Sequence, residues 1–198
     1  MPIAGTLPCP LNKKCTAHEQ CLTEEFILKQ FILATILAGA MALPTFAAMQ
    51  SPLGAVYYAP AGTVANQGDQ LVDPYFAAVE NNISLYAGLQ VLQSVLQATL
   101  SRDKDISAAD RADIDTALQL SRAMIHGGNI GARDKPRTTE GLLAFFKNAA
   151  WQDGEFVQGG RADAPGDANR WRPNLETKAV DVNTWGVAAL GGKQIDEW

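Results

Sequence analysis

The chain has 198 residues, of which 47% are hydrophobic and 19% are charged, and its formal net charge at pH 7 is −5. This composition is typical of one soluble domain with a separate segment attached. A mildly acidic chain without a basic patch argues against nucleic-acid binding, because such binding depends on neutralising phosphate groups. The sequence also contains no P-loop and no G-x-G-x-x-G motif, so neither common nucleotide-binding pattern is present.

An uncharged apolar run occupies residues 31–43, between Lys29 and Pro44. Small residues then stand at positions −3 and −1 of a cut after Ala47. These are the parts of a secretory signal, so we predict a signal peptide over residues 1–47 and a periplasmic or secreted product. The alternative is a retained membrane anchor, because the run can be extended to Met49 and then approaches the roughly 20 residues that cross a bilayer.

The first 27 residues fit poorly in front of such a signal. We therefore expect that translation starts near Leu28 and that an upstream extension has been added to the sequence. Cys9, Cys15 and Cys21 have the spacing C-x5-C-x5-C, which matches no common zinc or redox motif. Cleavage would leave no thiol and a single histidine, His126, which is expected to end a helix. We therefore predict neither a metal site nor a cofactor.

The region 48–72 is rich in proline and glycine and is predicted to be irregular. Asp73 and Pro74 then resemble a helix start, and apolar residues recur at spacings of three and four as far as Leu100. Asn81 and Asn82 provide an alternative break in that helix. Ser107 and Asp110 resemble a capping box for a second helix that ends at residues 127–128, so the two form an antiparallel hairpin.

Further helices are expected over residues 141–149, capped by Thr138 or Thr139, and from Asp181 or Thr177 to Gly191. No segment alternates apolar and polar residues long enough for a sheet, and residues 155–158 make at most one short strand. The predicted class is all-α over residues 73–198. The chain ends on Trp198 in the middle of a new amphipathic pattern, which leads us to expect the N-terminal part of a longer protein.

Two groups of polar residues are candidates for chemistry. Asp181 at a helix N-terminus beside Trp185 suits an acid, a base or a hydrogen-bond acceptor for a sugar, or it is simply the helix cap. Glu80 lies with two asparagines and Tyr86 on an otherwise apolar helix. These residues line the mouth of a cavity or, alternatively, cap a restarted helix.

Aromatic residues form a third group. Three tryptophans are interleaved with carboxylates, amides and arginines, a combination that suits the apolar faces and polar edges of sugar rings. Ordinary packing of loops over helix ends is the alternative. The tryptophans are Trp151, Trp171 and Trp185, and Arg170 lies beside the second.

The phrases ENNISLYAGLQVLQSVL, EGLLAFF with EFVQGG, and AVDVNTWGVAALG resemble successive hairpins of the α/α toroid of the six-hairpin glycosidase-like superfamily. The resemblance covers residues 73–198 and implies a site at one rim of an incomplete toroid. It implies catalytic roles for Asp181, Glu80 and Glu140. It implies substrate-binding roles for Trp151, Trp171, Trp185, Tyr86 and Arg170.

The leading hypothesis is an exported carbohydrate-active domain that cleaves glycosidic bonds with paired carboxylates. The alternatives are a non-catalytic carbohydrate-binding or scaffolding module, and an inactive fragment of a longer protein. The expected partner is a carbohydrate or another polar polymer, with no nucleic acid and no stable membrane span after cleavage. The remainder of the toroid, or a partner protein, is expected to cover an open apolar flank.

Overall fold

A computed structural model of the chain describes residues 40–59, 65–67, 70–72, 75–132, 134–162, 171–176, 178 and 180–198. These residues belong to one compact unit, Ile36–Trp198. The predicted signal up to residue 39, the helix start at Asp73 and Pro74, and the predicted site residue Arg170 lie outside the described residues. None of the helices in the described ranges has both the length and the hydropathy that a bilayer crossing requires.

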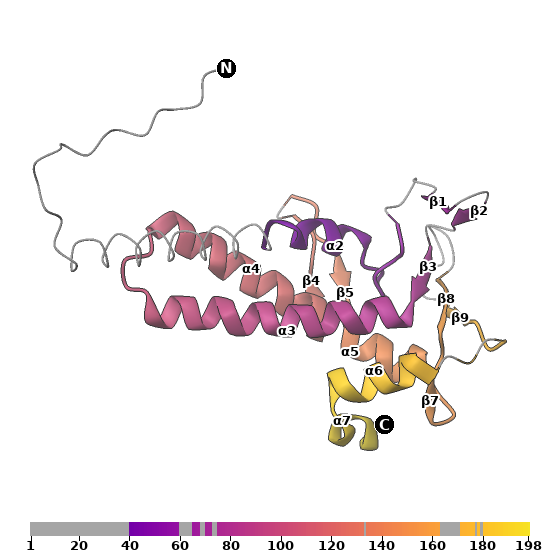
Figure 1. Ribbon diagram of the computed structural model, residues 1–198. Helices are drawn as coiled ribbons and strands as arrows, with labels where there is room; N and C mark the ends of the chain where they lie inside the picture. The colour runs from indigo at the N-terminus through magenta and orange to yellow at the C-terminus, as the bar shows by residue number, and fades with distance from the viewer. Residues whose placement is uncertain are drawn as a thin grey trace, which may run out of the picture. The chain divides into compact units, whose positions relative to one another are not determined.

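The longest elements are α3 (Val79–Arg102) and α4 (Ala108–His126), which form the predicted antiparallel hairpin (Figure 1). The predicted cap of α4 is confirmed, because Ser107 Oγ accepts a hydrogen bond from the backbone N–H of Asp110 at 3.1 Å. The predicted end is confirmed as well. Gly127 follows the helix with φ of +93°, a conformation that costs glycine little.

The start of α3 differs from the prediction, and the asparagines do not break the helix. Residues 76–78 form the strand β3 (Phe76–Ala78), and the helix begins only at Val79. Asn82 is accommodated within the helix because its amide bonds to the carbonyl of Ala78 one turn earlier and to both backbone groups of Val56. The apolar residues from Phe76 into α3 therefore belong to two elements, a strand and the helix that follows it, and not to one helix.

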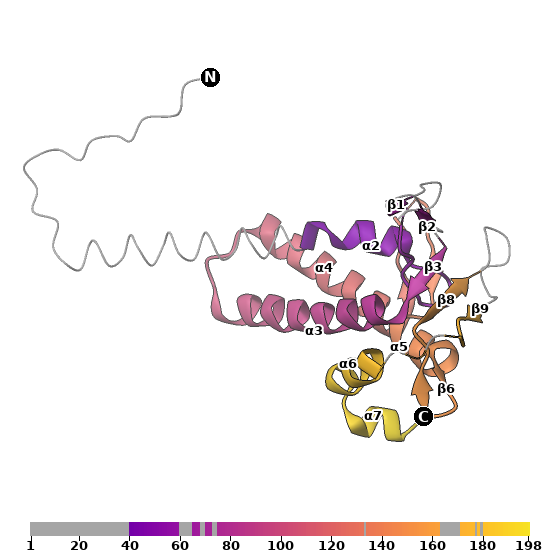
Figure 2. The same cartoon turned by 45° about the vertical axis from the view of Figure 1, so that its right-hand side comes forward.

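Shorter helices lie on two sides of α3. The helix α2 (Leu43–Met49) packs beside α4, whereas α6 (Val180–Leu190) packs on α3 and runs in the same direction (Figures 1 and 2). The predicted helix at 141–149 is α5 (Leu142–Phe145), which continues into a π-helical turn, η1 (Phe146–Ala150). After Gly191 the chain adds a last short helix, α7 (Gly192–Asp196).

The all-α prediction is wrong, because the described residues also form four small antiparallel sheets. Strands β3 and β8 contact α3, in a region where the resemblance to the toroid predicted only helical hairpins. Three sheets are two-stranded and one has the order β3-β8-β9. The strands are β1 (Ala65–Gln67), β2 (Gln70–Val72), β4 (Gly128–Asn129), β5 (Thr138–Thr139), β6 (Trp151–Gln152), β7 (Glu155–Phe156), β8 (Gly159–Ala162) and β9 (Trp171–Pro173).

Only β7 falls within the one short strand allowed at residues 155–158. The other strands escaped prediction because they hold only two to four residues, too few to show alternation. The central strand β8 begins with two glycines, which strand propensity disfavours. Here glycine is required for packing, since a Cβ on Gly159 would lie 2.7 Å from the Phe76 ring and one on Gly160 would lie 2.7 Å from the Trp171 ring. The β6–β7 hairpin turns through Asp153 and Gly154, both with positive φ, a pair typical of two-residue hairpin loops.

A line of aromatic rings forms the core below α3. Phe145 and Phe146 are buried, and their rings contact Trp171 and Tyr86 respectively. Phe156 contacts the Phe146 ring and also lies against α6 at Gly186, where a Cβ would come within 2.3 Å of the Phe156 ring. The contact is reinforced by a hydrogen bond of 2.7 Å from the backbone N–H of Phe156 to Asn183 Oδ1.

Candidate functional site

The three predicted catalytic carboxylates occupy three different elements. Glu80 is half-buried in the first turn of α3, and Asp181 is exposed in the first turn of α6. Because the two helices run in the same direction, both residues stand at the same end of this helix pair (Figure 1). Glu140 lies in the loop before α5, where its backbone N–H donates a 2.8 Å hydrogen bond to the carbonyl of Pro52.

Asp181 was expected either to act on a substrate or to cap its helix, and neither expectation describes its environment fully. Its Oδ1 accepts a 3.0 Å hydrogen bond from the backbone N–H of the next residue, Val182. Asp181 lines none of the three hollows described below, and Glu80 and Glu140 line none of them either.

The predicted substrate-binding aromatics divide into packed and exposed residues. The Trp151 ring contacts Phe156 and Trp198, and the Trp171 ring stands edge-on to Phe145. Tyr86 is buried edge-on against Phe146, and this burial raises the pKa of its phenol. Only Trp185 among these described residues is exposed to a large extent, at 50%.

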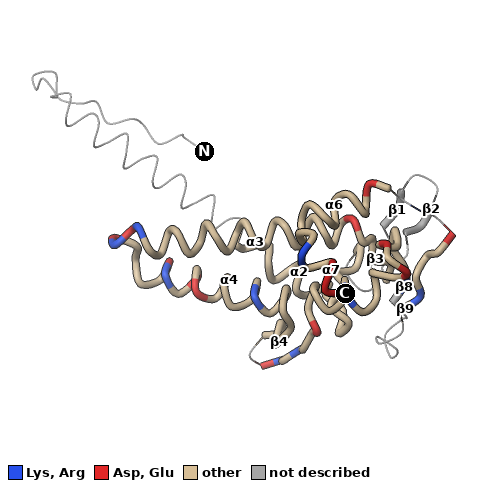
Figure 3. The backbone as a smooth tube through the Cα atoms, turned by 90° about the horizontal axis from the view of Figure 1, so that it is seen from below, with Lys and Arg blue, Asp and Glu red and all other residues tan. Residues whose placement is uncertain are grey.

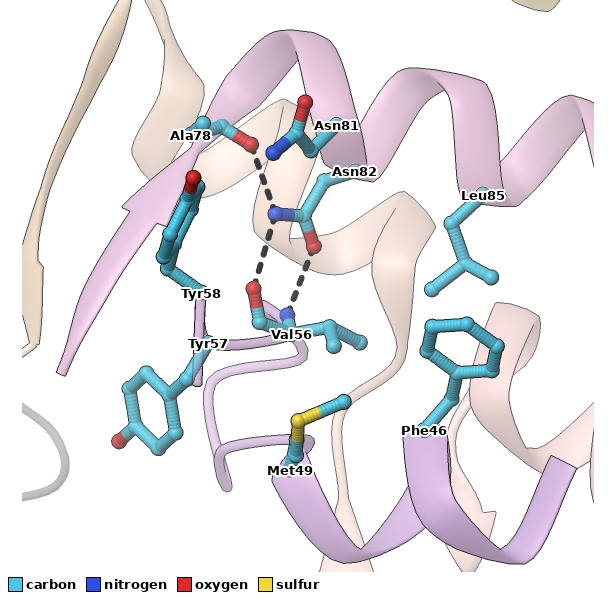
Figure 4. A pocket seen from close by; sticks show the side chains of 9 residues that line it. All are labelled: Phe46, Met49, Val56, Tyr57, Tyr58, Ala78, Asn81, Asn82 and Leu85. Carbon is cyan, nitrogen blue, oxygen red and sulfur yellow. Dashed lines mark hydrogen bonds between the residues drawn. The ribbon is translucent and has the colours of Figure 1, made fainter. Parts of the chain in front are cut away.

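The first hollow lies between α2 and α3 and has a volume of about 150 Å³ (Figure 4). Asn82 forms part of its wall, but its amide is fully used in hydrogen bonds. Oδ1 accepts from the backbone N–H of Val56, while Nδ2 donates to the carbonyls of Val56 and Ala78. The exposed Asn81 amide is the remaining carboxamide of this wall. The residues around the hollow are Phe46, Met49, Val56, Tyr57, Tyr58, Ala78, Asn81, Asn82 and Leu85.

Beside this hollow, a set of hydrogen bonds joins residues 47–56 to Asn82 and to residues 124–141, and we call it the polar junction. Arg137 donates from Nη1 to the carbonyl of Ala48 and from Nη2 to the carbonyls of Ala47 and Gln50, at 2.7 to 2.9 Å. Gln50 is buried and donates from Nε2 to the carbonyls of Gly54 and Met124. The bonds from Arg137 add a charged donor to carbonyls at and just after the C-terminal turn of α2, where a helix has fewer internal donors.

The second hollow is a groove of about 360 Å³ between α2 and α4. Met41 at its rim is largely exposed, whereas Leu43 beneath it is buried. The predicted signal cleavage site also belongs to this packed region. Ala47 lies in α2 with only 2% of its surface exposed.

The third hollow is an open, largely apolar groove of about 450 Å³ between α3 and α6. Trp185 and two alanines contribute from α6, and Ile83 and Ala87 contribute from α3. The polar side-chain groups of its lining residues are the hydroxyls of Ser84 and Thr184 and the indole N–H of Trp185. Thr184 already donates its hydroxyl to the carbonyl of Val180 at 3.2 Å.

The apolar surface continues from this groove along α3. Val91 is 64% exposed and Val95 is 38% exposed, although valine side chains favour burial. We call this surface the open face. It consists of Ser84, Ala87, Val91, Val95 and Ala98 on α3 with Trp185 and Ala188 on α6.

Charge separates α3 from its neighbour in the hairpin. No charged residue occurs in α3 between Glu80 and Arg102, whereas α4 carries charged residues at several exposed positions, among them Arg111, Asp115 and Arg122 (Figure 3). A helix that faces water on one side usually carries charged or polar groups there. The open face therefore departs from the pattern of a solvated helix.

Trp185 was a predicted site residue, but the exposed valines of α3 were not. Spacings of three and four along α3 predict a wide buried stripe, since spacing cannot tell which faces of a long helix are covered. A usable signal was present in the run of uncharged residues from 81 to 101. In the described residues, His, Cys, Asp and Glu side chains form no group of three that could hold a metal ion.

Comparison with known protein families, with characterised proteins and with solved structures finds no match for this chain. The site must therefore be interpreted from its own geometry.

Proposed function

We propose that this chain is a non-catalytic scaffolding module that binds a polypeptide through the open face. The observation that carries the proposal is an exposed, uncharged helix surface that joins an apolar groove beside a half-exposed tryptophan. Contiguous apolar surface of this kind on a folded protein is typical of an interaction site. A partly exposed tryptophan is also the residue type that most often contributes strongly to binding energy.

The chemistry of the groove favours a polypeptide over a sugar. Sugar binding needs polar groups that bond to hydroxyls around an aromatic platform. The groove offers two hydroxyls, and Thr184 already donates its own to the chain. An apolar helix, in contrast, needs a groove lined by small side chains and flanked by larger apolar ones, such as Ala87, Ala188 and Trp185 provide.

Glycosidic cleavage stays a prediction from the sequence. Glu80 and Asp181 stand at one end of the α3–α6 pair, but each lies outside the lining of the groove. Trp151 and Trp171 are packed against other rings and do not extend the surface around Trp185. The geometry therefore adds no support to a carboxylate pair in a tryptophan-lined cleft.

Site-specific photo-crosslinking in producing cells tests the proposal. A benzophenone amino acid in place of Trp185 is expected to give a light-dependent covalent adduct with a polypeptide. The same amino acid in place of Asp115, on the charged exposed side of α4, is the matched control and is expected to give none. Absence of an adduct at position 185, or equal adducts at both positions, would contradict the proposal.

Affinity electrophoresis in gels that contain soluble polysaccharides tests the main alternative. We expect no retardation of the wild-type chain. Retardation that disappears in Trp185→Ala would favour carbohydrate binding and would overturn the scaffolding proposal. Hydrolysis of a polysaccharide that is lost in Asp181→Asn and Glu80→Gln would reinstate catalysis.

A further inference from the structure

We infer that the open face is covered by a second copy of this chain, with the two α3 helices packed antiparallel around a two-fold axis at Val91. This inference rests on the proposed function and names its partner. It is carried by the distribution of charge and side-chain size along α3.

The relevant residues lie on one side of the helix. At 3.6 residues per turn, seven positions fall within a sector of about 80° on the helix surface. The side chains within the sector are exposed or half-exposed. They are Glu80, Ser84, Ala87, Val91, Val95, Ala98 and Arg102.

Charge along this sector is self-complementary. Its only charged residues are Glu80 at the beginning of α3 and Arg102 at the end, and Val91 lies midway between them. Two antiparallel copies centred on Val91 therefore place Glu80 of each copy opposite Arg102 of the other. Asp181 lies in the first turn of α6 and so adds a second negative charge at the same end of the helix pair.

Side-chain size follows the same symmetry. The antiparallel register places Val95 opposite Ala87 of the second copy and Ser84 opposite Ala98 of the second copy. On both sides of the axis the larger Val95 thus faces the small Ala87, as packing of ridges into grooves requires, and the small Ser84–Ala98 pairs allow the two helices to approach closely. Val95 of the second copy also approaches the α3–α6 groove, where Trp185 and Ala188 provide further apolar surface.

A two-fold arrangement satisfies both halves of the face at once, because each copy supplies the same surface to the other. The interface would extend along α3 for about 33 Å, from the level of Glu80 to that of Arg102. Neither copy would bury an unpaired charge, since the charged residues stand at the two rims.

Analytical ultracentrifugation of the purified chain over a range of concentrations tests this arrangement. The wild-type chain is expected to form a reversible dimer. Val91→Glu places two carboxylates opposite each other at the axis and is expected to weaken the dimer at least about 100-fold. The paired variants Asp115→Lys and Arg122→Glu on α4 should leave the dissociation constant unchanged.

Charge reversal tests the antiparallel register itself. Glu80→Lys and Arg102→Glu each turn two attractive contacts into repulsive ones, so each is expected to weaken the dimer by about tenfold. The double variant restores opposite charges across the interface and should recover most of that loss. Both single variants also weaken the interaction with the helix dipole within one chain, and the double variant combines those two losses. Recovery of dimerisation therefore cannot arise from restored monomer stability.

A disulfide trap gives a second readout. Val91→Cys in a chain with Cys9, Cys15 and Cys21 changed to serine is expected to form a 91–91 disulfide between copies under mild oxidation. Asp115→Cys in the same background is the control and should stay monomeric. Circular dichroism at low concentration verifies that each variant is folded.

Several outcomes would overturn the second-copy inference. A wild-type chain that is monomeric at about 1 mM would do so, because even a weak dimer forms at that concentration. A dimer that Val91→Glu leaves intact would do so as well. If the benzophenone at position 185 still gave adducts with a different protein, the scaffolding proposal would stand without the dimer. If it gave none, both would fail.

Discussion

The polar junction and the open face lie on different sides of the same helix hairpin and satisfy opposite requirements. At the junction, buried carbonyl and N–H groups of residues 47–56 are bonded to the side chains of Arg137, Gln50 and Asn82. At the open face, the apolar side chains of two valines and a tryptophan are exposed to water. The first arrangement stabilises the fold of a single chain. The second adds little to that stability and gains its value when another surface covers it.

This comparison can be tested by substitutions that act on one region at a time. Side chains of the junction should affect the free energy of unfolding strongly. Side chains of the open face should affect association and leave unfolding nearly unchanged.

The largest effect is expected for Asn82→Ala. The change removes three hydrogen bonds and leaves the buried N–H and carbonyl of Val56 without their partner, so the free energy of unfolding should fall by about 3 kcal/mol. Urea denaturation followed by circular dichroism measures it. The adjacent exposed residue provides the control, since Asn81→Ala should change stability by less than about 0.5 kcal/mol. Equal effects of the two variants would contradict the structural role of Asn82.

Arg137→Ala is expected to cost about 1.5 kcal/mol, because three carbonyls at the end of α2 lose a charged donor while part of the site stays open to water. Arg137→Lys should recover little of this, since a single ammonium cannot reproduce the planar fork of donors. Limited proteolysis offers a local readout, with faster cutting in residues 40–50. Arg122→Ala on α4 serves as the control, and faster cutting there too would show that the effect is not local.

Two glycines in helices provide a pair with opposite expected signs. In Gly186→Ala the new methyl group collides with the Phe156 ring, and we expect a net loss of about 1 to 2 kcal/mol despite the higher helix propensity of alanine. Gly88 has no heavy atom within 4 Å of an added Cβ, so Gly88→Ala should stabilise the chain by about 0.5 to 1 kcal/mol. Thermal unfolding at low protein concentration compares them. A loss in Gly88→Ala would show that α3 is more crowded there than the structure indicates.

The smallest effect is expected at the centre of the open face. Val91→Ser should change the free energy of unfolding of the dilute chain by less than about 0.5 kcal/mol, because 64% of the side chain is already exposed. The same variant should weaken association at high concentration, which sedimentation measures. A strong loss of stability in dilute solution would place Val91 in the core and remove the distinction between the two regions.

The helix hairpin could be predicted from the sequence, and the reason is visible in its residues. Ser107 and Asp110 carry a local capping signal, and Gly127 carries a local stop signal, so no distant contact is needed to place α4. The hairpin at Asp153 and Gly154 was equally local and was overlooked, since its two-residue strands are too short to alternate.

Other features depend on contacts that are far apart in the chain. Gly159 and Gly160 stand in a strand that pairs with β3 and β9, and the rings of residues 76 and 171 leave no room there for a Cβ, which no local pattern reveals. The exposure of the tryptophans could not be predicted from local sequence either. Trp151 precedes polar residues in the sequence and Trp185 precedes apolar ones, but Trp151 is packed against rings and Trp185 is half-exposed. Burial is decided by the elements that pack around each residue.

If the chain is cut after Ala47, as the signal-peptide prediction requires, the structure constrains when that cut can occur. Proteases cut exposed, extended chain, and this bond lies at the end of a helix with its carbonyl held by Arg137. A leader peptidase that recognises this bond must therefore reach it before the domain folds. A chain shortened in that way would also have to close the surface of α4 without Leu43 and Ala47, two side chains that the folded unit buries. Cleavage and folding would then compete for the segment that forms α2, and whichever is faster would decide which form of the protein accumulates.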